Sequence, residues 1–131
     1  MTSLPVIAAR IDAYDPVLLP ADEDTHRAAV AAVLREGPGG TELLFIKRAA
    51  RSGDPWSGHI AFPGGRKDQC DPDLTVTAVR ETREEVGLDL KSGELLGRLD
   101  DVPAHVNPIK VSIFVFDVSR LGDWAEERHF T

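Results

Sequence analysis

The sequence predicts a single α/β domain, of the α+β kind, in which several short strands pack with one amphipathic helix. Three observations predict it: an apolar run at residues 43–46, an alternating run at residues 109–116, and a helical pattern between them. A chain of 131 residues is long enough for one modest core and short for two. Its 42% hydrophobic and 28% charged residues are ordinary for a soluble globular protein.

Residues 1–24 are predicted to form an N-terminal arm ahead of the domain, which we place at residues 25–131. Apolar residues recur at loosely helical spacing from Leu4 to Tyr14, which indicates a short helix. The following segment, Asp15 to Asp24, contains two prolines and four acids. Such a composition is typical of a linker or of an arm lying on the surface.

The strands are predicted from apolar runs and from the turn signals between them. Ala28 to Leu34 is rich in alanine, and helix propensity alone would favour a helix there. A Gly-Pro-Gly-Gly turn follows at residues 37–40, and Glu42 to Arg48 gives a buried-strand signal, so a β-hairpin fits both segments best. Further strands are expected at residues 59–62, 94–99 and 109–118, with a turn at residues 100–103.

A helix with clustered acids is predicted after Phe62-Pro63-Gly64-Gly65, which we interpret as a glycine turn. Asp71 offers an N-cap, Pro72 suits the first turn, and Gly87 supplies the usual stop. At about 100° per residue the helix has two distinct arcs. One carries Glu81, Glu84 and Glu85, and the other carries Thr75, Ala78, Val79, Thr82 and Val86.

Three carboxylates on one arc repel each other, and a divalent metal ion is the natural compensation. Magnesium and manganese prefer hard oxygen ligands, usually carboxylates together with water and substrate phosphates. A solvated acidic face is the ordinary interpretation of a glutamate-rich helix. The glycine turn upstream and the Arg80-Glu81 pair favour the metal site instead.

The run from Arg80 to Leu88 resembles the second half of the Nudix box of the Nudix hydrolases, with Thr82 where an aliphatic residue is usual. In the first half, Gly65 lies one residue further from Arg80 than in the family pattern. Pro72 stands where the pattern has a glutamate, and Asp71 or Asp73 is expected to substitute for it.

The run from Trp56 to Gly65 resembles the coenzyme A diphosphatase branch of that family. That branch also has an arginine four residues before the glycine equivalent to Gly58. This sequence has Asp54 there, and its nearest arginines are Arg48 and Arg51.

The resemblance implies an α/β/α sandwich with a mixed sheet and assigns roles to the motif residues. The carbonyl of Gly65 would help to ligate Mg²⁺ or Mn²⁺, with Glu84 and Glu85 as principal ligands. Glu81 would be a further ligand or the base, and Arg80 would hold a glutamate of the box in register. Arg48, Arg51 and Gly64 are expected to bind substrate, because arginine can clamp phosphate oxygens and glycine allows close approach.

The implied activity is metal-dependent hydrolysis of a diphosphate bond in a nucleoside diphosphate linked to another group. Coenzyme A or a derivative is the leading substrate, with ADP-ribose, dinucleotides and damaged nucleoside triphosphates as alternatives. A Nudix-like binding or assembly module without turnover is the alternative from another class. The residue that takes the proton from water is left open, with Asp100, Asp101, Glu126 and Glu127 as candidates.

The remaining expectations concern the end of the chain and its partners. No long helix is indicated after Leu121, so we expect a domain shortened at its C-terminus. The sheet face left open would be covered by another subunit, as in a homodimer, or by the N-terminal segment. A net charge of −7 argues against nucleic acid or an anionic membrane as partner. The single Cys70 and the absence of a signal-peptide or transmembrane pattern favour a cytoplasmic protein.

Overall fold

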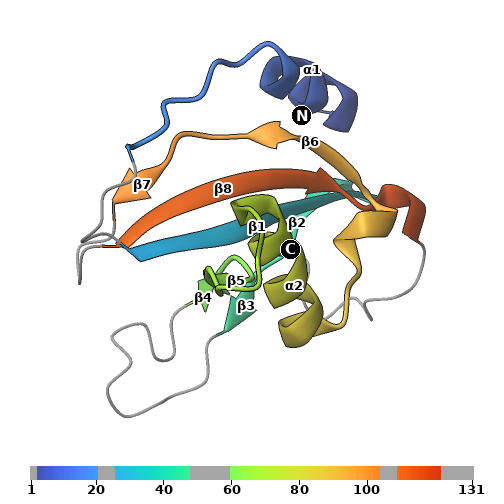
Figure 1. The fold of residues 1–131 in the computed structure, drawn as a ribbon. Helices are drawn as coiled ribbons and strands as arrows, with labels where there is room; N and C mark the ends of the chain where they lie inside the picture. Colours follow the sequence, from blue (N-terminus) through green and yellow to red (C-terminus); the bar gives the residue numbers. More distant parts are fainter. Residues whose placement is uncertain (1–2, 21–25, 48–59, 104–108, 122–131) are drawn as a thin grey trace.

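The computed structural model describes residues 3–20, 26–47, 60–103 and 109–121 (Figure 1). Its helices are α1 (Leu4–Asp12) and α2 (Leu74–Val86), with 3₁₀ turns η1 (Leu90–Ser92) and η2 (Ser119–Leu121). Its strands are β1 (His26–Gly37), β2 (Gly40–Leu43), β3 (Ile46–Lys47), β4 (Ile60–Ala61), β5 (Gly64–Arg66), β6 (Glu94–Arg98), β7 (Val102–Pro103) and β8 (Ile109–Asp117). The predicted strand at Ala28 to Leu34 and the predicted N-terminal helix are therefore confirmed.

A mixed sheet forms the centre of the fold, as predicted. Its long strand β1 pairs in parallel with β8 on one side. On the other side β1 pairs antiparallel with β2 and with β5, at different points along its length. The strands β6 and β7 both pair antiparallel with β8, and β3 and β4 form a separate two-stranded sheet.

The two helices cover opposite faces of this sheet (Figure 1). Alternate residues of a strand point to opposite faces, so β1 contributes Ala29, Ala31 and Val33 to the core beneath α2. The intervening Ala32 and Leu34 join the cluster beneath α1. Burial on both faces explains why an alanine-rich segment is a strand, since packing outweighs its helix propensity.

The helix α1 takes the position of the second helical layer. Leu4 is buried, and Ile7 and Ile11 pack against the same cluster. A Cβ atom on Gly97 of β6 would lie 2.6 Å from Cγ2 of Ile11, so only glycine lets the helix approach this strand so closely. We expected either another subunit or the N-terminal segment to cover this face of the sheet. The structure shows that the N-terminal segment covers it.

The segment that follows α1 is held by two neighbouring carboxylates. Asp100 accepts hydrogen bonds from the hydroxyl of Tyr14 at 2.6 Å and from the main-chain N–H of Val17 at 2.8 Å. Asp101 accepts one from the N–H of Leu19 at 2.9 Å, and its own N–H donates to the carbonyl of Val17. Both acids therefore anchor the N-terminal segment to the sheet.

Three details differ from the sequence prediction. The expected glycine turn is the strand β5, in which Gly64 and Gly65 pair with Val30 and Ala29 of β1. The expected strand at residues 42–48 is divided into β2 and β3. The expected turn at residues 100–103 includes β7, because Val102 and Pro103 pair with β8.

Thr82 lies on the buried face of α2, and Thr82→Val is expected to stabilise the protein. The side chain of Thr82 is fully buried, and its hydroxyl has no hydrogen-bond partner among the described residues. Valine has nearly the same shape without the unsatisfied polar atom, so we expect the free energy of unfolding to rise by about 1 kcal/mol. Thermal and urea unfolding would measure it.

Thr77→Val is the matched control for this prediction. Thr77 is equally buried, but its hydroxyl donates a 2.9 Å hydrogen bond to Oδ2 of Asp71. The same substitution should therefore lower the free energy of unfolding here, by about 1–2 kcal/mol. Equal effects of the two substitutions would contradict the assignment of Thr82 as an unsatisfied group.

Candidate functional site

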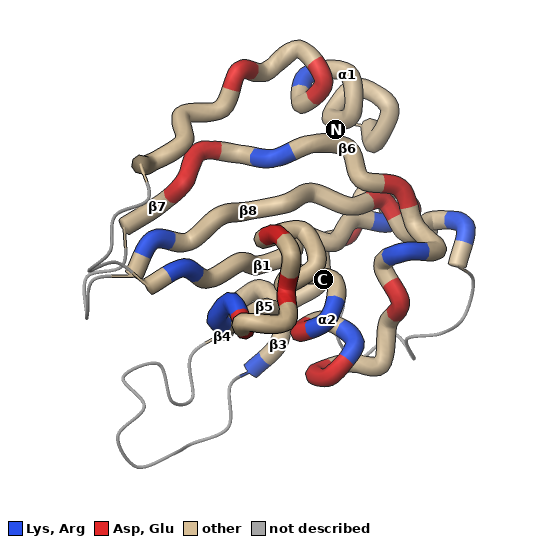
Figure 2. Tube along the Cα trace, in the orientation of Figure 1, with Lys and Arg blue, Asp and Glu red and all other residues tan. Residues whose placement is uncertain are grey.

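The helix α2 carries most of the candidate site, and local signals fix both of its ends. Asp73 is the N-cap, and its carboxylate accepts a 3.0 Å hydrogen bond from the N–H of Val76. This corrects the prediction of Asp71 as the cap and leaves Pro72 outside the helix. Gly87 ends the helix in the left-handed conformation, with φ of 75°, as predicted. Figure 2 shows acidic and basic residues gathered along α2, beside the largely uncharged middle of β1 and β8.

Asp71 and Arg80 form a two-pronged ion pair at the base of the site. Nε of Arg80 lies 3.0 Å from Oδ1 of Asp71, and Nη2 lies 2.9 Å from Oδ2. Asp71 is 4% exposed and also accepts hydrogen bonds from the N–H of Asp68 and the hydroxyl of Thr77. The hydrogen bonds from Arg80 hold the pKa of Asp71 well below its usual range, and Asp71 in turn raises the pKa of Arg80.

The other end of the Arg80 guanidinium binds two of the predicted metal-binding glutamates. Its Nη1 lies 3.0 Å from Oε1 of Glu81 and 3.2 Å from Oε1 of Glu84. Because Asp71 fixes the guanidinium, Arg80 orients both carboxylates. The expected pairing of Arg80 with a glutamate of the motif is thus present in the structure. Between Asp71 and Asp73, it is Asp71 that pairs with Arg80.

The strand β5 brings the two predicted glycines against the glutamates of α2. The N–H of Gly64 donates a 3.3 Å hydrogen bond to Oε1 of Glu85. A Cβ atom on Gly65 would lie 2.5 Å from Cδ of Glu81, so the main chain of Gly65 touches that carboxyl group. A Cβ on Gly64 would lie 2.3 Å from the carbonyl oxygen of Ala29, which excludes any larger residue there. The structure therefore gathers Gly64, Gly65, Glu81, Glu84, Glu85 and Arg80 in one place.

The donor atoms of this group suit a hard divalent cation. Glutamate oxygens with a main-chain carbonyl are the ligands that Mg²⁺ and Mn²⁺ prefer. The carboxylates are turned towards Arg80 and β5, however, rather than towards one point. Within residues 3–20, 26–47, 60–103 and 109–121, no three acidic, histidine or cysteine side chains stand close enough to hold a metal ion. The donor atoms of this group therefore suit a divalent cation. The glutamate side chains would have to rotate before they could ligate one.

Several predicted residues lie outside this group. Arg48, Arg51, Glu126 and Glu127 fall outside the described residues. Asp100 and Asp101, two candidates for the base, are occupied in anchoring the N-terminal segment. Burial alone would raise the pKa of Asp101, but hydrogen bonds from Ser112, Leu19 and Arg98 outweigh it, so the pKa is lowered. The sequence contains no local signal for two of these partners, because Ser112 lies 11 positions and Leu19 lies 82 positions from Asp101.

Among the described residues, no helix is both long enough and apolar enough to cross a membrane.

Comparison with known proteins identifies a family and several individual relatives. The family model of the NUDIX domain matches residues 25–128. The chain is 36% identical over 104 residues to the mitochondrial coenzyme A diphosphatase NUDT8 of Homo sapiens, covering 76% of this chain and 44% of that protein. It is 40% identical over 73 residues to an uncharacterized Nudix hydrolase, NudL, of Citrobacter koseri, covering 56% of this chain and 36% of that protein. The chain thus spans less than half the length of either relative.

Solved structures share the fold at lower identity. The Ap4A hydrolase of C. elegans matches with a TM-score of 0.62 and 21% identity, over 82% of this chain and 78% of that one. The NUDIX domain of Shewanella oneidensis NrtR, crystallised with ADP ribose, matches with a TM-score of 0.60 and 21% identity, over 91% and 72%. These likenesses confirm the predicted α+β sandwich with a mixed sheet.

Proposed function

The chain belongs to the NUDIX domain family, and on that premise we propose that it is a metal-dependent hydrolase of diphosphate bonds. Its substrate would be a nucleoside diphosphate linked to another group. The observation that carries this proposal is the junction of β5 and α2, where Gly64 and Gly65 meet Glu81 and Glu85. This junction places acidic oxygens beside backbone that a substrate can approach closely.

Hydrolysis of a diphosphate requires water to attack one phosphorus while the bond from that phosphorus to the bridging oxygen breaks. The products are two phosphate monoesters. A bound Mg²⁺ or Mn²⁺ would neutralise charge on the phosphate oxygens and make the water more acidic. Glu84 and Glu85 would hold the ion with the carbonyl of Gly65, and Glu81 would ligate it or accept the proton. Arg80, fixed by Asp71, would keep Glu81 and Glu84 in position.

Coenzyme A, or a derivative of it, is our leading substrate. The support is the resemblance of residues 56–65 to the coenzyme A diphosphatase branch, together with the 36% identity to a relative named as such an enzyme. Arg48 and Arg51 would bind the diphosphate in this proposal. Two structural neighbours are named for Ap4A hydrolysis and for a complex with ADP ribose, so dinucleotides and ADP-ribose are the second candidates.

Incubation of the purified protein with coenzyme A and Mg²⁺ tests the proposal. We expect release of 3′,5′-ADP and phosphopantetheine, faster than the hydrolysis of Ap4A, ADP-ribose or an oxidised nucleoside triphosphate. Removal of the metal with EDTA should abolish turnover, and added Mn²⁺ or Mg²⁺ should restore it. Preference for another of these substrates would overturn the coenzyme A assignment. Failure to hydrolyse any of them would favour a binding or assembly module.

Three further predictions concern the setting of the protein: its domain division, its location and its oligomeric state. We keep the division into an arm at residues 1–24 and a domain at residues 25–131. A cytoplasmic location and a homodimer also stay predictions. The named relatives include mitochondrial coenzyme A diphosphatases. Light scattering of the purified chain would measure whether it forms a dimer.

A further inference from the structure

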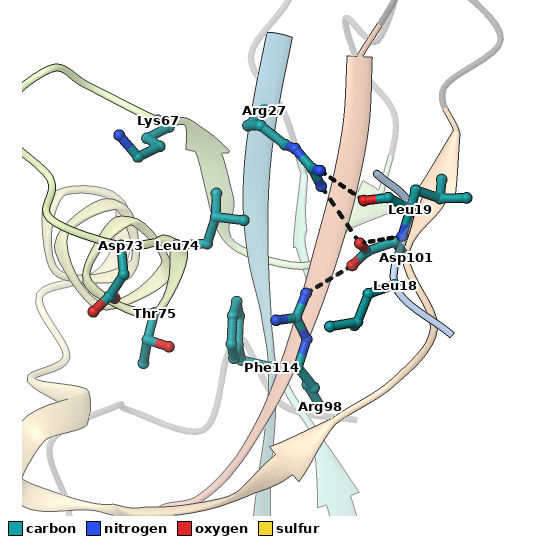
Figure 3. A pocket seen from close by; sticks show the side chains of 10 residues that line it. All are labelled: Leu18, Leu19, Arg27, Lys67, Asp73, Leu74, Thr75, Arg98, Asp101 and Phe114. Carbon is teal, nitrogen blue, oxygen red and sulfur yellow. Dashed lines mark hydrogen bonds and ion pairs between the residues drawn. The ribbon is translucent and has the colours of Figure 1, made fainter. Parts of the chain in front are cut away.

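A pocket of about 420 Å³ lies between the first turn of α2 and the N-terminal segment, on the face of the sheet that α2 covers (Figure 3). That volume is in the range of small-molecule sites. Leu74 of α2, Phe114 of β8 and Leu18 of the N-terminal segment give the pocket apolar walls. Figure 3 shows the side chain of Leu18 pointing into the pocket. One wall therefore comes from outside residues 25–128, which match the family model.

The pocket adjoins the carboxylate group of α2. Lys67 lines the pocket and directly follows β5, and its main-chain N–H donates a 2.9 Å hydrogen bond to the carbonyl of Arg27 on another wall. The carbonyl of the preceding residue, Arg66, accepts a 3.3 Å hydrogen bond from Nη2 of Arg80. Adjacent residues of the chain thus line the pocket and contact the guanidinium that orients the glutamates. A substrate whose diphosphate lies at α2 can therefore extend into this pocket.

The wall opposite α2 is formed by residues 14–20, which we call the N-terminal strap. Besides its hydrogen bonds to Asp100 and Asp101, the strap accepts a 2.7 Å hydrogen bond from Nη2 of Arg27 at the carbonyl of Leu19. The helix α1, packed on the sheet, holds its other end. Leu18 is nonetheless 53% exposed. A half-exposed leucine on a firmly held main chain is available to pack against a bound molecule.

The charges around the pocket pair with each other and leave little for an anion. Asp101, whose side chain is 1% exposed, pairs with Nη2 of Arg98 at 2.8 Å and with Nη1 of Arg27 at 3.4 Å. Asp73 caps α2, and Figure 3 shows the amino group of Lys67 pointing away from the arginines. A neutral group with flat apolar faces and polar edges therefore suits this pocket better than a phosphate does.

We propose that the N-terminal strap completes the substrate site and that Leu18 packs against the nucleoside of the bound substrate. This inference rests on the proposed function, because every candidate substrate named there carries a nucleoside. A nucleobase is neutral and flat, so it can pack its faces against Leu18 and Phe114 while its edge stays hydrogen-bonded. Leu18 is then a specificity-determining residue. Asp100 is a positioning residue, because it acts by holding the strap.

Titration with α,β-methylene-ADP, in which a methylene group replaces the bridging oxygen, tests the inference without hydrolysis. In NMR spectra of the whole chain with Mg²⁺, we expect saturable shifts at the methyl groups of Leu18 and Leu74 and at the amides of Gly64 and Gly65. Ile7, on the opposite face, should not shift. Methylenediphosphonate, which lacks the nucleoside, should shift only the glycine amides.

The two probes separate failure of the strap from failure of the proposed function. If α,β-methylene-ADP shifts the amides of Gly64 and Gly65 but not Leu18, the role of the strap is overturned and the proposed function stands. Equal shifts at Leu18 from methylenediphosphonate would also overturn the contact with the nucleoside. If neither probe causes a shift at any of these residues, the inference and the proposed function are both overturned.

Leu18→Ala removes the apolar contact and should weaken binding of α,β-methylene-ADP about fivefold. With a hydrolysed substrate, KM should rise to the same extent while kcat stays within about twofold, because the contact is alike in the ground state and the transition state. Val17→Ala is the matched control, since Val17 is the next residue, is 62% exposed and does not line the pocket. It should leave binding and KM unchanged. Equal effects of the two substitutions, or none from Leu18→Ala, would overturn the assignment.

Variants of Asp100 test whether the strap must be held in place. Asp100→Ala removes the acceptor of the hydrogen bonds from Tyr14 and Val17, and should weaken binding of α,β-methylene-ADP about threefold, because the strap is placed for a smaller fraction of the time. Asp100→Asn keeps an acceptor oxygen and should restore binding. Methylenediphosphonate should bind both variants alike. Unchanged binding of α,β-methylene-ADP in Asp100→Ala, or an equal loss for both probes, would overturn the positioning role.

Discussion

Glu85→Gln is expected to lower the rate of diphosphate hydrolysis about 1000-fold, with little change in stability. Glu85 is exposed on α2, so the substitution creates no cavity. Glutamine keeps an oxygen that can accept the hydrogen bond from Gly64, and it loses only the negative charge. In the proposed mechanism that charge holds the metal ion. Turnover at saturating substrate and Mg²⁺, together with the thermal midpoint, measures both parts of the expectation.

Glu94→Gln provides the matched control for Glu85. Glu94 is also exposed and lies on β6, away from β5 and α2. The same change of one charge should leave turnover within about twofold there, because distant exposed charges are screened by salt. Near-normal turnover in Glu85→Gln, or an equal loss in Glu94→Gln, would show that Glu85 does not act at the reacting diphosphate.

The helix α2 could be predicted from the sequence because its signals are local. Acids, apolar residues and glycine at fixed spacing determine which side chains share an arc and where the helix ends. The same spacing identified Glu81, Glu84 and Glu85. What spacing could not show is that Arg80 stands between Glu81 and Glu84, since that position depends on Asp71 in the preceding loop.

The parts that sequence reasoning missed depend on contacts between distant segments. The glycines at residues 64–65 have the composition of a turn, yet they form β5 because β1 offers an open edge next to them. Asp101 looked like a turn residue, and its role comes from Arg27, 74 positions away, and from Arg98. No local pattern reports such partners.

Asp71→Asn is expected to lower the free energy of unfolding by about 3 kcal/mol and to reduce turnover as well. Asp71 is buried and accepts from Arg80 at both carboxylate oxygens. Asparagine has one acceptor oxygen, so one of those bonds is lost and the guanidinium faces an amide N–H₂. Arg80 would then be less firmly placed against Glu81 and Glu84. Urea unfolding and turnover measure the two effects.

Asp73→Asn is the control, because it makes the same chemical change two residues away. Asp73 caps α2 from an exposed position, and asparagine is as good an N-cap as aspartate. Its free energy of unfolding should therefore change by less than about 0.5 kcal/mol. Similar losses of unfolding free energy in both variants would mean that the ion pair between Asp71 and Arg80 stabilises the protein no more than the carboxylate of Asp73 does.

The pH dependence separates the ion pair from a simple packing effect. Because Arg80 lowers the pKa of Asp71 in the folded protein, the stability due to this carboxylate is fully present above the unfolded-state pKa, about 4. It is lost as the pH falls from there through the lower folded-state pKa. The difference in unfolding free energy between the unaltered protein and Asp71→Asn should therefore be smaller at pH 3 than at pH 7. A difference independent of pH would indicate that shape, and not the charge on Asp71, holds Arg80 and the glutamates in place.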